Sequence, residues 1–496
     1  MSWAAFVVDE REWSRHGEDM TDFILEPSPD EFAAWVDAAV QRLRPFLQRL
    51  PTAPHLDAED GLAVARSLRQ PFSTSGSSMP EALDVVLQAA QPGFHTAGPG
   101  YLAYIPGGGL LHAAVADLVA NSLNRYVGIW AAAPGLVQLE QNVVDWFGDV
   151  VGYDRAGDVV PGGFLTSGGS LANFSGVFTA RRALLSSSAE LAGARLYTSQ
   201  QAHHSVAKAA VLAGFDAEQV RAIDVDDAFC IDVAALRRAV DADIAEGLRP
   251  LVVIGQGGST NTGAVDDLNA LADVCAEHQM WFHVDAAYGG FFMLTSRGRA
   301  RLRGLSRADS VTLDPHKGLF LPYGTGALVV KDRQKLKAAH DMSGAYLTAL
   351  QSDDACVDYS QMSPELSRDF RGLRVWLPLA VVGTEAFAAQ LDEKLDLAAQ
   401  AADTLASWDE VEVVATPQLS VLAFRLRGQG DDVNRAWLDA VNAKGRVMLS
   451  GTYVEVRAER TFVLRLAVLS FRTHTTHVQH ALEDLRQTLC DVVNQR

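Results

Sequence analysis

The sequence predicts an α/β fold built on a mostly parallel, doubly wound sheet. Between residues 162 and 330, short apolar runs typical of buried strands alternate with amphipathic helical segments. Strands that alternate with helices in this way are joined by crossover connections, which place helices on both faces of a parallel sheet. Loops rich in glycine and small polar residues follow several of the runs, as expected where strands end at a ligand site.

The periodicity predicts six strands and four helices in this region. The strands are expected at residues 195–198, 220–223, 251–254, 280–284, 310–313 and 326–330. The helices are expected at residues 170–183, 206–213, 233–245 and 268–277. Short, strand-like apolar runs suit strands, whereas apolar residues three or four positions apart suit helices. Asp285 and Lys317 then follow two of the strands, at one edge of the sheet.

Residues 1–91 are expected to form a helical N-terminal arm. Ser28-Pro29-Asp30-Glu31 is typical of a helix start, with proline in the first turn. An apolar face follows at helical spacing, made by Phe32, Trp35, Val36, Ala39, Val40 and Leu43. Because this arm has too little core of its own, we expect it to pack on another subunit.

The remainder is expected to divide into a large domain, residues 92–375, and a smaller α+β C-terminal domain, residues 376–496. Helical periodicity runs from residue 376 to about residue 406. Strands are expected at residues 411–414, 421–426 and 462–469, and helices at residues 433–441 and 476–489. This mixture of strands and helices is what predicts a separate α+β unit.

Composition limits the function classes. The chain has 496 residues and a formal net charge of -19, which argues against a nucleic-acid-binding surface. Its apolar runs fall short of the roughly 18 residues of a membrane span, and its first residues lack the pattern of a signal peptide. The four cysteines match no zinc, redox or disulfide pattern, so a cytoplasmic location is expected. No acidic partner or cysteine is expected to approach the histidines at 474, 477 and 480, so a solvated helix start is favoured there over a metal site.

Lys317 is the strongest candidate for chemistry. It follows Asp314-Pro315-His316 among apolar and small residues, where burial favours a neutral, nucleophilic amine that condenses with aldehydes. Asp285 ends the apolar run of residues 281–284. Together they indicate a pyridoxal phosphate site, in which Lys317 forms a Schiff base with the aldehyde and Asp285 pairs with the pyridinium nitrogen. The alternative is an exposed lysine and a strand-end aspartate, each common on its own.

Three loops at the predicted sheet edge add weaker signals. Thr166-Ser167-Gly168-Gly169-Ser170 opens a helix, where glycines and free N–H groups suit a phosphate. The alternative is an ordinary serine N-cap, and the lysine of a nucleotide P-loop is absent. His203 follows another strand and could stack on a planar ring, or simply begin a helix. Thr260 lies in a further loop that offers hydroxyl groups at the same edge. The alternative is that this loop is only a glycine turn.

The order of these segments carries more information than any one of them. With HVDAAY at residues 283–288 and DPHK at residues 314–317, the chain resembles the group II pyridoxal-phosphate-dependent amino-acid decarboxylases, the family of aromatic-L-amino-acid decarboxylase. The resemblance is densest between residues 95 and 317. It implies the fold type I (aspartate aminotransferase-like) architecture, pyridoxal 5'-phosphate as cofactor, and decarboxylation of an L-amino acid, aromatic in the commonest case.

The resemblance also implies roles for individual residues. Lys317 carries the cofactor, and Asp285 keeps its ring nitrogen protonated. Ala287 and His203 flank the ring, and Thr260 contacts the cofactor near Asp285. The phosphate is bound by Gly168, Gly169 and Ser170, with His316 close by.

For the substrate, the resemblance implies that Tyr104, His203 and Tyr346 line its pocket. Tyr346, with His203 behind it, protonates the substrate carbon after CO₂ leaves. The active site forms between two subunits of a homodimer. This chain departs from the animal enzymes in having Asp314 where they have asparagine and Gly318 where they have tryptophan. An aminotransferase or an aldehyde synthase of the same fold remains the alternative, although Tyr346 argues against the synthase, which carries phenylalanine there.

Overall fold

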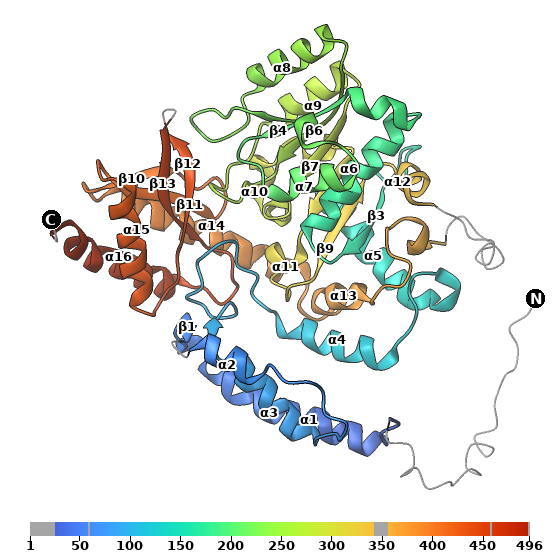
Figure 1. The fold of residues 1–496 in the computed structure, drawn as a ribbon. Coiled ribbons are helices and arrows are strands. Elements are labelled where there is room, and N and C mark those ends of the chain that lie inside the picture. The colour runs from blue at the N-terminus through green and yellow to red at the C-terminus, as the bar shows by residue number, and fades with distance from the viewer. Residues whose placement is uncertain (1–24, 58–59, 342–355, 457–458, 495–496) are drawn as a thin grey trace, which may run out of the picture. The chain divides into compact units, whose positions relative to one another are not determined.

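The computed structural model describes residues 25–57, 60–341, 356–456 and 459–494. The chain divides into two compact units after Phe94 (Figure 1). Within the described ranges, no single helix is long and apolar enough to span a membrane. One bent pair of helices, Arg371–Val382 and Thr384–Ala406, meets those criteria together, by length and composition only.

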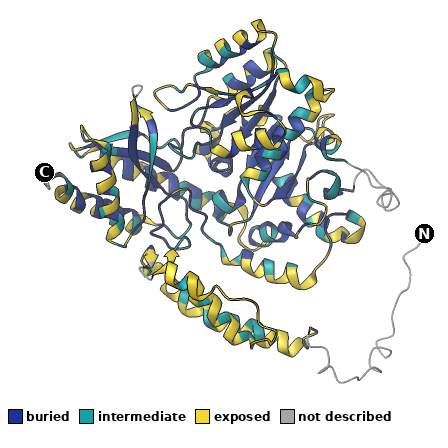
Figure 2. Cartoon of the chain, in the orientation of Figure 1, coloured by how far each residue is buried: buried dark blue, intermediate teal, exposed yellow. Residues whose placement is uncertain are grey.

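The first unit is helical, as predicted. Its helices are α1 (Pro29–Arg49), α2 (Gly61–Ser67) and α3 (Met79–Ala89), and its short strands β1 (Leu56–Asp57) and β2 (Gly93–Phe94) pair antiparallel. Capping boxes begin α1 and α3, where Ser28 pairs with Glu31 and Ser78 with Glu81. None of these three helices contains a buried residue (Figure 2). As expected, these three helices do not enclose a core of their own.

The second unit contains a seven-stranded sheet in the order β3-β9-β8-β7-β6-β4-β5. The strands are β3 (Gly162–Thr166), β4 (Ala194–Ser199), β5 (Val220–Ile223), β6 (Arg249–Gln256), β7 (Trp281–Asp285), β8 (Ser310–Leu313) and β9 (Gly326–Val330). Only β9 runs against its neighbours, so the predicted mostly parallel sheet is confirmed. Its central strands are buried (Figure 2).

Nine helices of the second unit precede residue 341. They are α4 (Leu111–Leu123), α5 (Pro134–Val151), α6 (Gly169–Leu184), α7 (His204–Leu212), α8 (Val233–Ala245), α9 (Leu268–Glu277), α10 (Ser296–Arg301), α11 (Pro315–Gly318) and α12 (Arg333–His340). The helices expected between the strands are all present. Strand β3 was not predicted, because its first two residues are glycines, which are depleted in strands. Gly163 is required there, since a Cβ atom would lie 2.1 Å from the Leu328 carbonyl oxygen on β9.

Strand register aligns the carboxyl ends of the central strands. Gln256 at the end of β6 pairs with Asp285 at the end of β7, and Asp285 pairs with Thr312 on β8. The segment that carries Lys317 leaves the sheet directly after β8. The predicted placement of Asp285 and Lys317 at one edge of the sheet is therefore confirmed.

The C-terminal part forms a second, antiparallel sheet in the order β10-β11-β13-β12. Its elements, after the bent pair α13 (Arg371–Val382) and α14 (Thr384–Ala406), are β10 (Val411–Ala415), β11 (Val421–Leu426), α15 (Asp431–Ala443), β12 (Ser450–Val456), β13 (Glu459–Ala467) and α16 (Thr475–Asn494). The single helical region expected from residue 376 is wrong in one respect, because Gly383 at φ 82° separates two helices. The domain boundaries at residues 91 and 375 stay predictions.

A buried ion pair joins α5 to the segment before α13. Arg368 Nη2 lies 2.6 Å from Glu140 Oε1, and both side chains are 0% exposed. The same guanidinium lies over the Tyr359 ring, 4.7 Å from its centroid, and donates to the Leu165 carbonyl oxygen. Removing one partner leaves the other charge buried without its counter-ion.

We expect Glu140→Ala to lower the free energy of unfolding by about 3–5 kcal/mol, measured by urea denaturation. The matched control is Glu190→Ala, which breaks a partly exposed pair with Arg249 and is expected to cost less than about 1 kcal/mol. The double variant Glu140→Leu/Arg368→Met should recover much of the loss, because no unpaired charge remains. Equal effects of Glu140→Ala and Glu190→Ala would contradict this prediction.

Candidate active site

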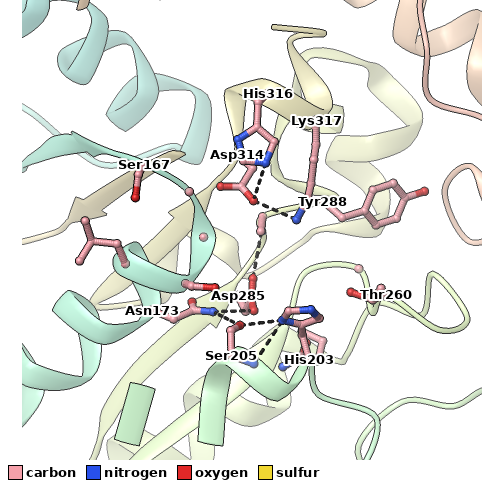
Figure 3. Close-up of a pocket in the computed structure, with 17 residues that line it drawn as sticks. Ser167, Asn173, His203, Ser205, Thr260, Asp285, Tyr288, Asp314, His316 and Lys317 are labelled. Carbon is pink, nitrogen blue, oxygen red and sulfur yellow. Dashed lines mark hydrogen bonds and ion pairs between the residues drawn. The ribbon is translucent and has the colours of Figure 1, made fainter. Parts of the chain in front are cut away.

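A cavity of about 370 Å³ lies at the carboxyl ends of the parallel strands (Figure 3). Loops that follow β3, β4, β6, β7 and β8 contribute its wall. The wall includes every residue that the sequence predicted to contact a cofactor: Gly168, Gly169, Ser170, His203, Thr260, Asp285, Ala287, His316 and Lys317. Segments up to about 150 residues apart therefore meet in one place, as the order of the motifs predicted.

The turn between β3 and α6 forms one side of the cavity. Helix α6 begins at Gly169 with no side-chain cap, so its first N–H groups are available to a ligand. Gly169 keeps this turn close to its neighbours, since a Cβ atom would lie 3.0 Å from Asp314 Oδ2 and 3.2 Å from Ala287 Cβ, both tight contacts. The alternative of an ordinary serine N-cap is wrong, because Gly168 occupies the cap position and Ser170 lies inside the helix.

Asp285 lies at the base of the cavity and is 6% exposed. Its Oδ2 atom accepts a hydrogen bond of 2.8 Å from Asn173 Nδ2, and its Oδ1 accepts one of 3.2 Å from the Ala287 backbone N–H. Asn173 lies in the first turns of α6, 112 residues away in sequence. Sequence reasoning missed Asn173, since no local pattern marks its contact with Asp285.

Lys317 lies beside a carboxylate and not, as its neighbours in sequence suggested, among apolar groups alone. Its Nζ atom lies 2.9 Å from Asp314 Oδ2, and its side chain is 23% exposed (Figure 3). Burial is the largest single influence and lowers the pKa of Lys317, but Asp314, with a smaller contribution from Asp285, raises it, and the net shift is upward. The expectation that burial favours a neutral amine is therefore wrong here, because a carboxylate one helical turn earlier stabilises the ammonium. The alternative of a fully exposed surface lysine is wrong as well.

Two histidines approach the same cavity. His203 is the N-cap of α7, where its Nδ1 accepts from the Ser205 backbone N–H at 3.2 Å. Burial and the neighbouring His204 lower the pKa of His203. Burial also lowers the pKa of His316, whose Nε2 atom lies 3.5 Å from Asp314 Oδ2. Both rings therefore favour the neutral form, in which one nitrogen donates and the other accepts.

Of the residues predicted to contact the substrate, only His203 lines the described cavity. Tyr104 is 53% exposed and does not belong to the described cavity wall. Its carbonyl oxygen accepts from the guanidinium of Arg465, which also donates to the carbonyl oxygen of Thr260 in the wall. Arg465 thus holds two loops of the site together from β13, a contribution that sequence reasoning missed. Tyr346 lies outside the described residues.

The histidine cluster of residues 474–480 does not line the described cavity. His474 Nδ1 lies 2.7 Å from Glu393 Oε1, so α14 supplies an acidic partner from a distant part of the sequence. The expectation that no acidic residue approaches these histidines is wrong. In the ranges that the structure describes, no group of three or more His, Cys, Asp or Glu side chains could hold a metal ion.

The donors in the cavity fit a planar phosphorylated aldehyde. Free N–H groups at the start of α6 suit a phosphate, the Asp285 carboxylate suits a ring cation, and Lys317 suits an aldehyde. Gln256 also lines this cavity, and its buried Nε2 atom has no hydrogen-bond partner in the described part of the chain.

Comparison with known proteins also indicates an enzyme that binds pyridoxal phosphate. Residues 69–427 match the model of the pyridoxal-dependent decarboxylase conserved domain. The aromatic-L-amino-acid decarboxylase of Bacillus atrophaeus is 32% identical over 91% of this chain and 94% of its own length. That of Rattus norvegicus is 29% identical over 98% of this chain and 99% of its own.

Solved structures agree with this assignment. The crystal structure of Oryza sativa TDC with PLP and tryptamine superposes with a TM-score of 0.88 at 26% identity, covering 95% of this chain and all of the other. Its likeness confirms the fold type I architecture, and its bound PLP agrees with the cofactor that the cavity fits. The chain belongs to the pyridoxal-dependent decarboxylase family and is a pyridoxal-phosphate-dependent amino-acid decarboxylase.

Proposed function

We propose that this enzyme converts an aromatic L-amino acid to its amine and CO₂, using pyridoxal phosphate joined to Lys317. The observation that carries the proposal is the convergence of Lys317, Asp285 and the start of α6 on one cavity. The aromatic substrate is supported by the names of the similar relatives, which are aromatic-L-amino-acid decarboxylases. When bound, pyridoxal phosphate supplies a ring that accepts the electron pair left on Cα as CO₂ departs.

Each group of the cavity would hold one part of the cofactor. Gly168, Gly169 and Ser170 would bind the phosphate through the free N–H groups of α6, with His316 beside them. Asp285 would hold the proton of the ring nitrogen, since a buried carboxylate stabilises a neighbouring cation. Ala287 and His203 would flank the ring, and Thr260 would contact the cofactor near Asp285.

Different side chains would carry out the two proton transfers of the reaction. Lys317 must give up the proton that Asp314 now stabilises before its amine can attack an aldehyde. Tyr346, with His203 as its support, would protonate Cα after CO₂ leaves. Tyr104 would shape the pocket for the substrate side chain. These assignments follow the family resemblance, and Tyr346 is assigned on that ground alone.

The enzyme is proposed to work as a cytoplasmic homodimer with the active site at the subunit interface. The helices of the first unit have no buried residues and expose apolar side chains, including Phe32, Val40, Leu43, Val85 and Val86. In the second unit, α4 exposes Leu111, Val115, Leu118, Val119 and Leu123. Apolar faces of this extent favour burial against another chain. Cys230, Cys275 and Cys490 are free thiols, in keeping with a reducing compartment.

The activity test is a product assay on the purified chain with pyridoxal phosphate and each of the twenty standard amino acids. We expect equimolar amine and CO₂ from an aromatic amino acid, with no oxygen uptake at an oxygen electrode. A keto acid product would indicate an aminotransferase, and oxygen consumption with an aldehyde product would indicate an aldehyde synthase. No turnover of any aromatic amino acid would contradict the proposed substrate class.

Asp314→Asn is expected to speed the attachment of pyridoxal phosphate to Lys317 near neutral pH. Because Asp314 raises the pKa of Lys317, the neutral amine appears only as the pH rises toward that raised pKa. Asparagine removes the charge while burial remains, so the pKa falls and the pH profile of attachment moves to lower pH. The neutral fraction of Lys317 at a given pH therefore rises, so we expect attachment several-fold faster near neutral pH.

Stopped-flow absorbance of cofactor-free protein mixed with pyridoxal phosphate measures this rate across pH. The control is Asp332→Asn, which removes one negative charge at the N-cap of α12 while asparagine still caps the helix. Its profile should match the wild type. An Asp314→Asn profile that also matches the wild type would show that the ion pair does not limit attachment.

A further inference from the structure

A buried chain of hydrogen bonds runs beneath the cavity from Trp281 to Asp285. Trp281 Nε1 donates to Ser310 Oγ at 2.8 Å, and Ser310 Oγ lies 2.7 Å from His283 Nδ1. His283 Nε2 lies 3.0 Å from Asn173 Oδ1, and Asn173 Nδ2 donates to Asp285 Oδ2 at 2.8 Å. All five residues are buried, so each of these contacts is made without competition from bulk water.

Asn173 can adopt only one amide orientation in this network. Its Nδ2 atom faces the Asp285 carboxylate, which accepts hydrogen bonds, and also Ser205 Oγ at 3.1 Å. Its Oδ1 atom accepts from Thr312 Oγ1 at 2.7 Å and faces His283 Nε2. Both donors and both acceptor positions of the amide are used. Rotating the amide would place its oxygen against the carboxylate and lose these bonds.

The amide orientation determines the tautomer of His283. A carbonyl oxygen only accepts, so His283 Nε2 must carry the proton. Burial lowers the pKa of His283 to about 4, so the ring is neutral and its Nδ1 accepts from the Ser310 hydroxyl. That hydroxyl is free to donate because Trp281 already donates to its oxygen. Gly176 leaves room for the ring, since a Cβ atom there would lie 2.7 Å from His283 Cε1.

The second branch of the network reaches His203 (Figure 3). Ser205 Oγ accepts from Asn173 and lies 2.8 Å from His203 Nδ1. His203 Nδ1 also accepts from the Ser205 backbone N–H, so it carries no proton. The Ser205 hydroxyl therefore donates to Nδ1, and the proton of the neutral ring is at Nε2. Asp285 and His203 are thus both oriented by the single side chain of Asn173.

We propose that Asn173 is a positioning residue that fixes the orientation of the Asp285 carboxylate and, through Ser205, holds His203 in the tautomer protonated at Nε2. A buried hydrogen bond between an amide and a carboxylate fixes how both side chains lie. Asn173 also lines the cavity, and its proposed effect is exerted through these two side chains. The inference rests on the proposed function, since it takes Asp285 as the partner of the ring nitrogen of pyridoxal phosphate.

The rival explanation is that Asn173 only completes a buried polar core. A core role would weaken the binding of any ligand that fits the cavity. A role through Asp285 would weaken only a ligand whose ring nitrogen carries a proton. Deaza-pyridoxal phosphate, in which a C–H group replaces that nitrogen, separates the two explanations.

The test measures equilibrium dissociation constants of the cofactor-free full-length chain for pyridoxal phosphate and for the deaza analogue, by protein fluorescence. For Asn173→Leu we expect pyridoxal phosphate to bind about ten- to a hundredfold more weakly, with the analogue within about twofold of wild type. The matched control is Thr179→Val, which removes another buried hydrogen-bonding group from α6 and should change neither constant. Equal losses for both ligands, or no loss for either, would overturn the proposal. Failure of the wild type to bind pyridoxal phosphate would overturn the proposed function instead.

A second measurement determines the tautomers in the wild type itself. Nitrogen-15 NMR of histidine-labelled, cofactor-free wild type distinguishes the two neutral tautomers, with His283→Gln and His203→Gln used only to assign signals. We expect both rings to be protonated at Nε2 and not at Nδ1. A proton at Nδ1 of either ring would overturn the proposal, whether or not Asn173→Leu folds.

Discussion

Lys317→Ala is expected to abolish decarboxylation, with a loss of about a thousandfold or more in kcat, because no other amine can take its place in the covalent step. Among the described residues that line the cavity, Lys317 is the one lysine. The visible absorbance band that forms when the wild type is mixed with pyridoxal phosphate should be absent from the variant. Absorbance spectroscopy and amine release measured on the same samples check both expectations.

Lys317→Arg is the matched control for this experiment. Arginine retains a cation beside Asp314, whose carboxylate is otherwise left buried without the partner 2.9 Å away. The arginine variant should therefore keep the unfolding free energy close to that of the wild type while remaining inactive. If Lys317→Ala retains the absorbance band or measurable turnover, Lys317 is not the residue that carries the cofactor.

Asp285→Asn is expected to lower kcat by about a hundred- to a thousandfold, the loss typical of removing one electrostatic contact made in the transition state. Asparagine has the shape of Asp285 but no charge with which to hold a proton on the ring nitrogen. It also places an amide against the Nδ2 donor of Asn173, which now donates to Oδ2 at 2.8 Å. Steady-state kinetics with the best substrate of the amino-acid panel measure this loss.

The matched control for Asp285→Asn is Asp243→Asn. Asp243 is also a buried carboxylate, but it accepts from Tyr197 and pairs with Arg221 on the far strands of the sheet. Its replacement should lower the unfolding free energy and leave kcat unchanged. Comparable losses of kcat in both variants would attribute the Asp285 effect to general destabilisation.

Much of the fold was predictable because its signals are local. Residues 220–223, 310–313 and 326–330 were predicted as strands with the bounds that the structure has. Strand β12 was missed because Ser450-Gly451-Thr452 lacks the apolar run that marked the others. The helix break at Gly383 was not predicted, because helical periodicity continues on both sides of it. The break is visible only in the backbone conformation of Gly383.

The candidate site was predictable as a set of positions but not as a set of interactions. Every predicted cofactor residue lines the cavity, since strand ends of a parallel sheet converge on one edge. The bond from Asn173 to Asp285 spans 112 residues, and that from Arg465 to Thr260 spans 205. No pattern within a few residues can encode such contacts, so Asn173 and Arg465 went unrecognised.

The sequence by itself therefore determined which elements form and which chemical groups the site contains. Periodicity, glycine and capping residues act over a few positions, so they can be recognised in the chain alone. Only the tertiary structure decided the charge state of Lys317 and the orientation of Asp285. Asp314 stabilises the ammonium of Lys317, and the amide of Asn173 faces Asp285 with its donor. A charge state depends on the distance to other charges and on burial, and both are properties of the folded chain.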